Sequence, residues 1–534
     1  MATRLVSRRF PWTAQHTQLF AKPTYGQHRT LSTRVRSKPT ANKPFLRKVA
    51  GVGSAFAFTL WWMSRSAEAE SPPSQSKKQF PSTTPLNTFA PPQHDISAAN
   101  IEAAQAELVA IVGADVISTV PGELKAHAST EWSPSPTETT ASFIVYPSST
   151  EQVSEIMKVC HARNIPVTPF SGGTSLDGAL AATRGGICID FSQMNKIVEL
   201  RKNDLDVTLQ PAVGWEELNT VLEKDGLFLP VDPGPGAEIG SMIATGCSGT
   251  NAYRYRPMKN RVISATIVLA DGTIATLKLT ALPKNQEVAV VAFPTVRTAI
   301  EAVTEMIQSG LQTEALELLD ETAMQASNQS GYLEKEYKEV PTLFIKFAGA
   351  TEDAVHRQIS AVEKVVQRYK SILFEASSDP DSMDSLWGAR KTVLWNLIAQ
   401  KRNDTDKFLS CDVAVPISQL ARIIEETNDR IKASGLLGSC LGHVGDDNFH
   451  TTVSCSESEK EKAEEIILWC RRRGIELDGT VTGEHGFGLA PRDLVTEELG
   501  ANATDMMRMI KLSLDPKCLL ACDKIVRIEE GEEH

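Results

Sequence analysis

The chain has 534 residues, a formal net charge of −11 and 41% hydrophobic residues, an ordinary globular composition with room for two or three domains. The acidic balance, with no long basic run after the N-terminus, argues against a nucleic-acid-binding surface. The nine cysteines are an odd number without a C-x-x-C pair, which argues against a disulfide framework or a structural zinc site and indicates buried, reduced thiols.

The N-terminus has the composition of a targeting segment. Residues 1–66 are rich in Arg, Ser and Thr, and the first acidic residue of the chain is Glu68. This pattern predicts a mitochondrial presequence, and a disordered basic tail is the alternative. Residues 49–63 form an apolar run that ends near Trp61 and Trp62 and is shorter than the ~20 residues of a clean membrane span. It is expected to be a short inner-membrane anchor or a cleaved sorting signal, with the mature protein at the inner membrane or on its intermembrane-space side.

Strands and helices alternate after a Ser-, Pro- and Gln-rich stretch at 67–96, which predicts a disordered linker. Apolar periodicity predicts helices, the first of them capped by Ser97, and shorter apolar runs predict strands. The helices are expected at 97–112, 147–164 and 214–224, and the strands at 143–146, 166–170, 185–191 and 206–210. A further hairpin is expected over 262–279, with a two-residue turn at Asp271-Gly272.

Two loops rich in glycine and hydroxyl side chains lie in this region, at 171–178 and 232–251. Small residues directly after a strand let the backbone approach a diphosphate, with bare N–H groups as donors. Neither loop has the G-x-G-x-x-G spacing, so a Rossmann fold is not supported. Each loop alone is also compatible with a simple turn. Two such loops in one alternating domain indicate a large phosphate-bearing ligand clasped from two sides.

The second half of the chain alternates strands with longer helices. Strands are predicted at 288–293, 315–319, 342–347, 372–374, 409–413 and 438–443, and helices at 296–308, 352–370, 417–433 and 457–473. Few strands separated by long helices predict an α+β domain, a sheet with helices on one face.

Three histidines and a glutamate cluster among glycines near the C-terminus. If Asp446 and Asp447 are the two loop residues of a hairpin, His443 pairs directly with His450. Directly opposed Cβ atoms lie about 4.5–5.5 Å apart, a spacing that suits two imidazoles on one divalent metal ion. Glu484 would be the third ligand, and its neighbour His485 would be free to act as a base. A polar turn beside an unrelated loop is the alternative.

Together these motifs resemble the FAD-dependent D-lactate dehydrogenase (cytochrome) family, in its fungal mitochondrial form, within the group of FAD-binding oxidoreductases with the vanillyl-alcohol-oxidase-like fold. The resemblance runs from about Ser97 to Ile528. It is most specific at 169–178, 242–255, 386–391, 412–416, 442–450 and 479–488.

The resemblance implies a fold and a domain order. The fold is α+β, with a vanillyl-alcohol-oxidase-like FAD-binding domain of two α/β subdomains followed by a ferredoxin-like α+β substrate or cap domain. The expected order is the presequence at 1–66, the linker at 67–96, the FAD-binding domain at 97–282, the substrate- and metal-binding cap domain at 283–500 and a segment at 501–534 that returns to the FAD-binding domain.

It also implies roles for individual residues. Non-covalent FAD would be held by Ser171, Gly172, Gly173, Thr174, Ser175, Leu176, Pro233, Gly234, Ile239, Gly240, Thr245, Cys247, Gly249 and Thr250. Arg390 would bind the substrate carboxylate as a bidentate fork, instead of lying on a helix surface. His443, His450 and Glu484 would hold a divalent metal, zinc or manganese, and His485 would take the hydroxyl proton.

The implied reaction is oxidation of D-lactate to pyruvate by hydride transfer to FAD, with cytochrome c as electron acceptor. D-2-hydroxyglutarate or glycolate as substrate, an inactive isoform that binds FAD poorly, and a metal-dependent hydrolase are the alternatives. Both glycine-rich loops and Arg390 argue against the hydrolase.

Several departures from the family fall on the flavin side. Ile274 runs directly into Ala275, where relatives insert a long stretch with a Gly-Ser-Glu-Gly-x-Leu-Gly motif. Arg256 stands where relatives have Gly, Ser241 replaces the second Gly of a Gly-Gly-Met motif, and Ala521 replaces an Asn that often touches the flavin. Asp447 replaces a turn Gly, and Asp tolerates the left-handed region, so the turn is expected to form.

Overall fold

The computed structural model of the chain describes residues 81–130, 133, 138–270, 275–278, 280–281, 285–331, 333 and 335–528. The expected presequence, the apolar run at 49–63 and the tight turn at 271–272 lie outside these residues. Within them, no helix is both long and apolar enough to cross a membrane. All nine cysteines are free, and eight are buried, which confirms the prediction of reduced thiols.

The first sheet of the N-terminal half has the strand order β1-β2-β4-β3. It consists of β1 (Ile117–Ser118), β2 (Phe143–Val145), β3 (Val167–Phe170) and β4 (Ile187–Asp190), and β2, β4 and β3 run parallel. Helices α2 (Ala98–Val112) and α4 (Thr150–Arg163) pack on one face, and α3 (Pro121–Ala126) lies at the other. Every residue of β2 and β4 is buried, as parallel strands covered on both faces require. Ser97 precedes α2, but its Oγ donates to Asp95 instead of accepting a helix N–H.

The second sheet has the order β5-β6-β9-β8 and is antiparallel. It consists of β5 (Ile197–Arg201), β6 (Asp206–Leu209), β8 (Val262–Ala265) and β9 (Ala275–Lys278), packed on α5 (Trp215–Leu222) and α6 (Ile239–Thr245). The predicted hairpin exists, but its register differs from the expected one. A two-residue turn at 271–272 would pair Ala265 with Lys278, whereas Ala265 pairs with Ala275. A bulge between Val262 and Ser264 shortens the ladder. A two-stranded ribbon joins β7 (Leu227–Phe228) to β10 (Thr280–Ala281).

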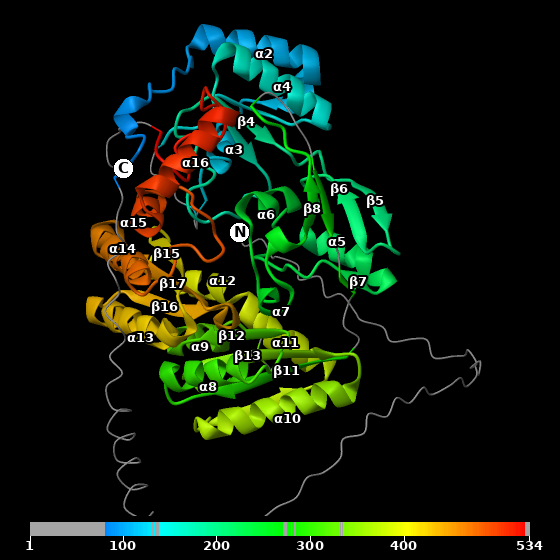
Figure 1. Ribbon diagram of the computed structural model, residues 1–534, viewed down its shortest axis with the longest axis vertical. Coiled ribbons are helices and arrows are strands. Elements are labelled where there is room, and N and C mark those ends of the chain that lie inside the picture. The colour runs from blue at the N-terminus through cyan, green and yellow to red at the C-terminus, as the bar shows by residue number, and fades with distance from the viewer. Residues whose placement is uncertain are drawn as a thin grey trace, which may run out of the picture. The chain divides into compact units, whose positions relative to one another are not determined.

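The C-terminal half is built on a seven-stranded antiparallel sheet of order β14-β11-β13-β12-β16-β17-β15. Its strands are β11 (Asn285–Ala292), β12 (Ala315–Leu319), β13 (Thr342–Gly349), β14 (Leu373–Ser377), β15 (Lys407–Ala414), β16 (Leu437–Gly442) and β17 (Asn448–Cys455). Figure 1 shows this sheet in the part of the molecule away from the two smaller sheets.

Both faces of this sheet are covered, so the prediction of helices on one face is wrong. One face packs on α8 (Val296–Gln308), α10 (Glu352–Arg368), α13 (Ile417–Ser434) and α14 (Lys460–Glu476). The other packs on α9 (Glu321–Gln329), α11 (Pro380–Lys391) and α12 (Val393–Ile398). Along β11 successive side chains point to opposite faces of the sheet. Ala289 and Val291 pack in the core with α8, α10, α13 and α14, and Val288 and Val290 pack in the core with α9, α11 and α12.

The C-terminal segment runs back to the N-terminal half. After α15 (Val495–Leu499) and α16 (Ala501–Leu514), the chain lies beside β3: Val167 N–H donates to Leu519 O (2.7 Å) and Ala521 N–H to Val167 O (3.2 Å). Figure 1 shows α16 against the N-terminal half of the molecule.

Residues 81–96 correct the expectation of a disordered linker over 67–96. Buried Asp505 of α16 accepts hydrogen bonds from the backbone of Thr83 and Thr84 and from the hydroxyl of Ser82. Further along, Asp95 N–H donates to Asn164 O (3.0 Å). The segment is held by backbone hydrogen bonds to distant residues, which its polar composition does not reveal.

Short helix α7 (Ala252–Tyr255) links the second sheet to the seven-stranded sheet. Arg254 Nη1 and the Tyr255 hydroxyl both bond the carboxylate of Glu314, each at 3.1 Å, just before β12. Glu314 is fully buried, and burial raises the pKa of its carboxyl, while Lys346 and Arg254 lower it. Because a buried charge must be paired, this contact fixes how the halves meet.

Candidate active site

A cavity of about 470 Å³ lies where the two glycine-rich loops face the seven-stranded sheet. Its walls come from four places: the loop after β3, the stretch from Asp232 to Thr250, helices α11 and α12, and one face of β15, β16 and β17. The segment that carries Glu484 and His485 also lines the cavity. Ligand sites commonly occur as concave pockets between such substructures.

Ten of the fourteen residues expected to hold FAD line this cavity. They are Gly172, Thr174, Ser175, Leu176, Pro233, Gly234, Thr245, Cys247, Gly249 and Thr250. The other four do not appear on its walls. Ser171 Oγ donates to Glu238 (2.7 Å), and Gly173 packs on the Phe170 ring. Ile239 is fully buried in the core beside the second sheet, and Gly240 lies against Pro211. The contacts of these four residues are made with neighbouring parts of the protein, away from the cavity.

The two loops touch each other, and a glycine is required at the contact. Gly172 has a φ of 69°, and a Cβ there would lie 2.9 Å from Gly236 O. On the second loop, the buried carboxylate of Asp232 accepts from the Thr250 hydroxyl (2.5 Å) and from Asn251 N–H (2.9 Å). The Gly172 contact joins the two loops, and the Asp232 bonds tie together the two ends of the second loop, whose residues line the cavity.

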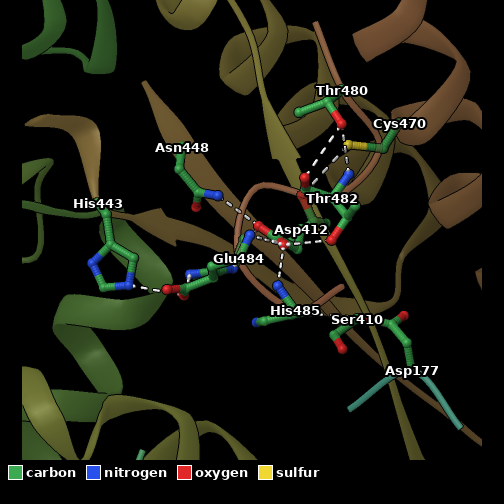
Figure 2. A network of polar contacts seen from close by, with 12 residues as sticks. Asp177, Ser410, Asp412, His443, Asn448, Cys470, Thr480, Thr482, Glu484 and His485 are labelled. Atoms are coloured by element: carbon green, nitrogen blue, oxygen red, sulfur yellow. Dashed lines mark hydrogen bonds and ion pairs between the residues drawn. The ribbon is translucent and has the colours of Figure 1, made fainter. Parts of the chain in front are cut away.

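His443, His450 and Glu484 converge on one point. Both Nε2 atoms lie 3.0 Å from Glu484 Oε1, and one potential ligand atom from each residue lies within 4.8 Å of the others. Two imidazole nitrogens and a carboxylate oxygen are a donor set that zinc and other divalent transition metals accept. Figure 2 shows His443 and Glu484 meeting from opposite sides of the site.

The predicted register of the histidine hairpin is wrong, although the two rings still meet. Leu441, not His443, pairs with His450. Residues 444–446 form a 3₁₀ turn, and the amides of Asp446 and Asn448 both donate to His443 O, which widens the loop. Asp447 adopts the left-handed conformation (φ 62°), as expected. His443 therefore reaches the site from the loop, with its ring centroid 5.2 Å from that of His450.

A carboxylate orients the His443 ring through its far nitrogen: His443 Nδ1 lies 2.9 Å from Glu317 on β12. His450 Nδ1 lies 3.6 Å from Asp412 on β15, beyond hydrogen-bond distance. Although burial lowers it, Glu317 and Glu484 raise the pKa of His443 well above its usual value. Burial raises the pKa of Glu484, but His443 and His450 outweigh this and hold it well below its usual value. The carboxylates therefore require positive charge beside them, which a divalent cation supplies as well as a proton does.

Asp412 also shapes the loop that carries Glu484 and His485. It is almost fully buried and accepts the backbone N–H groups of both residues, at 2.7 and 2.8 Å, together with Asn448 Nδ2 (2.6 Å) (Figure 2). A Cβ at Gly483 would lie 1.7 Å from Asn448 Nδ2, so only glycine fits this turn. The glycines near Glu484 thus allow the loop to wrap around one buried carboxylate.

Arg390 lines the cavity and is buried, so it is not a surface residue of α11. Its Nε and Nη2 donate to Glu317 Oε2 at 3.1 and 2.5 Å. Glu317 therefore links Arg390 to His443. One edge of the guanidinium is engaged in this way, and the edge formed by the two Nη atoms carries the remaining N–H groups that a ligand carboxylate can accept.

His443, His450 and Glu484 are called the metal-type cluster below. His485 lies beside this cluster and also lines the cavity. Its ring stacks on that of His450, with centroids 4.9 Å apart and planes 5° apart. It stands next to the converging ligand atoms without belonging to them. A neighbouring imidazole that is not a metal ligand is suited to accept a proton from a molecule held there.

Sequence reasoning did not assign roles to Asp232, Glu317 and Asp412, although each is buried at the site. A signal was present for two of them. Glu317 and Asp412 are single acidic residues inside apolar strands, in the sequences Leu316-Glu-Leu318 and Cys411-Asp-Val413. An acid at such a position is buried only if it is paired, so it points to a charged partner across the sheet.

Arg256 has a φ of 70° and a ψ of 159°, a combination that is found almost only at glycine. A side chain at this position therefore costs backbone strain of about 1–3 kcal/mol.

Comparison with known proteins follows the same division of the chain. Residues 141–278 match a family model described as FAD binding domain, and residues 282–525 match one described as FAD linked oxidases, C-terminal domain. Mitochondrial D-lactate dehydrogenase (cytochrome) of Kluyveromyces lactis is 42% identical over 427 residues, covering 73% of this chain and 74% of that protein. D-lactate dehydrogenase (cytochrome) 1 of Saccharomyces cerevisiae is 38% identical over 495 residues, 84% of each chain.

A solved structure of p-cresol methylhydroxylase with substrate bound is similar in fold, with a TM-score of 0.67 and 13% identity, over 82% of this chain and 99% of that one. The vanillyl-alcohol-oxidase-type fold expected from the sequence is thereby confirmed.

Proposed function

The chain belongs to the mitochondrial D-lactate dehydrogenase (cytochrome) family of FAD-linked oxidases, and on that premise we propose that it oxidises D-lactate to pyruvate with cytochrome c as the final electron acceptor. In the balanced reaction, D-lactate would lose a hydride from C2 and the hydroxyl proton, bound FAD would supply the two-electron acceptor, and oxidised cytochrome c would take up the electrons. The observation that carries the proposal is the convergence of His443, His450 and Glu484 beside His485 in a cavity walled by both glycine-rich loops.

The metal-type cluster and His485 have different roles at the substrate hydroxyl group. When bound, a divalent cation lowers the pKa of a coordinated hydroxyl, and FAD supplies the two-electron acceptor. His443, His450 and Glu484 would hold the cation, zinc or manganese, and Glu317 orients the His443 ring. His485 takes the hydroxyl proton, because its ring stacks on a ligand ring without itself being a ligand.

Arg390 binds the substrate carboxylate through its Nη edge, while Glu317 holds the other edge. Glu317 also bonds His443, so one carboxylate sets the spacing between the carboxylate-binding and hydroxyl-binding groups of the site. A 2-hydroxy acid presents its carboxylate and its hydroxyl on adjacent carbons, and the linked pair matches that arrangement.

On the cofactor side, the ten lining residues of the two loops would hold non-covalent FAD, and the loops' backbone N–H groups would supply donors for a diphosphate. The direct join of Ile274 to Ala275 leaves β8 paired with β9 and the second sheet intact. Glycolate is less well supported as a substrate than D-lactate, since a glycolate oxidase subunit of Bacillus subtilis is 25% identical against 42% for the Kluyveromyces protein.

The visible spectrum of the purified full-length protein tests this function. We expect the absorption bands of oxidised flavin, near ~370 and ~450 nm, to bleach on anaerobic addition of D-lactate and not of L-lactate. Oxidised cytochrome c should restore them. A protein that purifies without flavin and does not take up added FAD would indicate instead the inactive isoform, with the join at Ile274 as its cause.

We also propose a mitochondrial location at the inner membrane or on its intermembrane-space side, as the sequence of residues 1–66 suggests. Two relatives carry the word mitochondrial in their names. Protease treatment of intact and of outer-membrane-ruptured mitochondria should degrade the protein only after rupture. Full protection until the inner membrane is also dissolved would contradict this and indicate the matrix.

A further inference from the structure

A buried carboxylate from the loop after β3 reaches across the cavity wall to the segment that carries His485. Asp177 directly follows the lining residues Thr174 to Leu176 of that loop, and it is 8% exposed. Its carboxylate Oδ2 lies 3.7 Å from His485 Nδ1. In Figure 2 the short segment of Asp177 is cyan, the colour of the N-terminal half, whereas Glu484 and His485 belong to the C-terminal half.

The nitrogen that faces Asp177 is otherwise unpaired. His485 Nδ1 is buried, and it has no hydrogen-bond partner among the described residues. A buried polar atom without a hydrogen-bond partner costs free energy. Because the Asp177 carboxylate lies so close to His485 Nδ1, we expect the two to form a hydrogen bond when cofactor and substrate are bound. The other carboxylate beside His485, Asp412, is occupied with the backbone N–H groups of Glu484 and His485.

Asp177 is held in place by the same C-terminal half. Its Oδ1 accepts from Arg471 Nη2 of α14 at 2.9 Å, and its backbone O accepts from Leu489 N–H at 2.7 Å. A Cβ at Gly488 would lie 1.9 Å from that same backbone oxygen, so only glycine permits the approach. The position of Asp177 is thus fixed independently of His485, as expected of a group that orients another one.

We propose that Asp177 is the positioning residue of His485, which holds the Nδ1–H tautomer so that Nε2 is the atom that accepts the substrate proton. The inference rests on the proposed role of His485 as base. The two ring nitrogens lie on different edges of the imidazole, and a carboxylate on Nδ1 decides which one carries the proton. Because Asp177 belongs to the loop that lines the cofactor side of the cavity, alignment of the base depends on that loop being seated against Leu489.

The test is Asp177→Asn in the full-length, FAD-loaded protein. Its amide oxygen keeps the charge-assisted bond to Arg471, which directs the amide NH₂ toward His485 and favours the Nε2–H tautomer, the form that cannot take the proton. We expect flavin reduction at saturating D-lactate to slow on the order of 100-fold, with the dissociation constants for FAD and D-lactate within about twofold of wild type. Asp177→Glu, which keeps the carboxylate, should recover most of the rate.

Asp190→Asn is the matched control, since Asp190 is a buried carboxylate in the same half of the molecule, paired with His127 at 2.7 Å. Two-dimensional ¹⁵N NMR of histidine-labelled protein, with the His485 signal assigned by its loss in His485→Gln, gives a readout independent of turnover. The tautomer should change in Asp177→Asn and not in Asp190→Asn. An unchanged His485 tautomer, or a slower rate explained fully by lost FAD, would overturn the proposal.

A double substitution separates this proposal from the base assignment itself. If His485 is the base, His485→Gln alone is slow, and adding Asp177→Asn should slow it no further, because the two side chains act as one unit. If His485→Gln alone reduces flavin at the wild-type rate, the base assignment fails, whatever Asp177 does. If His485→Gln slows flavin reduction, and Asp177→Asn slows the double variant further by the same factor as it slows the wild type, only the positioning role of Asp177 fails.

Discussion

Replacing His485 by glutamine is expected to slow the reduction of bound flavin by D-lactate on the order of 1,000-fold. A positioned general base contributes about 10²–10⁴-fold to proton transfer, and glutamine keeps the approximate shape of the side chain without a basic nitrogen. His485 lies against His450 and next to Glu484, and it is an imidazole beside the three converging residues that is not one of them. Stopped-flow absorbance at the flavin band measures the rate directly.

The same variant should bind FAD normally, because His485 is not one of the glycine-rich-loop residues that line the cavity on the cofactor side. His356→Gln is the control: His356 is an exposed histidine of α10 that pairs with Glu287 at 3.0 Å, far along the sheet from the site. It should reduce flavin as fast as the wild type. Wild-type speed in His485→Gln itself would mean that another group removes the hydroxyl proton.

Removal of divalent cations by a chelator is expected to lower D-lactate oxidation on the order of 100-fold, with recovery on addition of zinc or manganese. A cation at a developing alkoxide contributes several kcal/mol to catalysis, and His443, His450 and Glu484 provide its ligand atoms. Glu484→Gln removes the charged ligand and should purify with little bound metal. Elemental analysis of the dialysed protein, beside the rate, checks both statements.

Glu317→Gln should produce an intermediate result, because Glu317 orients His443 without being one of the three converging residues. Loss of such a partner weakens metal binding about 10–100-fold. Glu287→Gln is the matched control, since Glu287 is a buried glutamate paired with His356 on the same sheet, outside the cavity. Full activity of the wild type after complete removal of metal would remove the cation from the mechanism.

Local sequence patterns predicted much of the C-terminal half. The helix at 296–308 and the strand at 315–319 have the predicted bounds, because the helix has a 3.6-residue apolar period and the strand is a short apolar run buried on both faces. The helix predicted at 457–473 begins three residues later, at Lys460, since Ser456 and Glu459 form a capping box around a 3₁₀ turn. Short or less periodic elements, among them α9, α12 and β5, were not predicted.

Pairing between distant segments could not be predicted in the same way. Two-residue turns were expected at Asp446-Asp447 and Asp271-Gly272, but His450 pairs with Leu441 and Ala265 with Ala275. Register depends on which face of each strand is buried and on bulges, and neither is a property of the turn residues alone. The docking of residues 81–96 on Asp505 depends likewise on a carboxylate more than 400 positions away.

The sequence by itself determined the chemical groups of the site: two loops rich in glycine and hydroxyl side chains, two histidines and a glutamate that can hold a cation, and a third histidine beside them. Only the tertiary structure decided how these groups are oriented. Glu317, Asp412 and Asp177 approach His443, His450 and His485 from three different elements, so their partners follow from chain topology and not from spacing. The physical reason is that a buried carboxylate is stable only where the fold brings a cation or a donor to it, and that meeting is set by long-range packing.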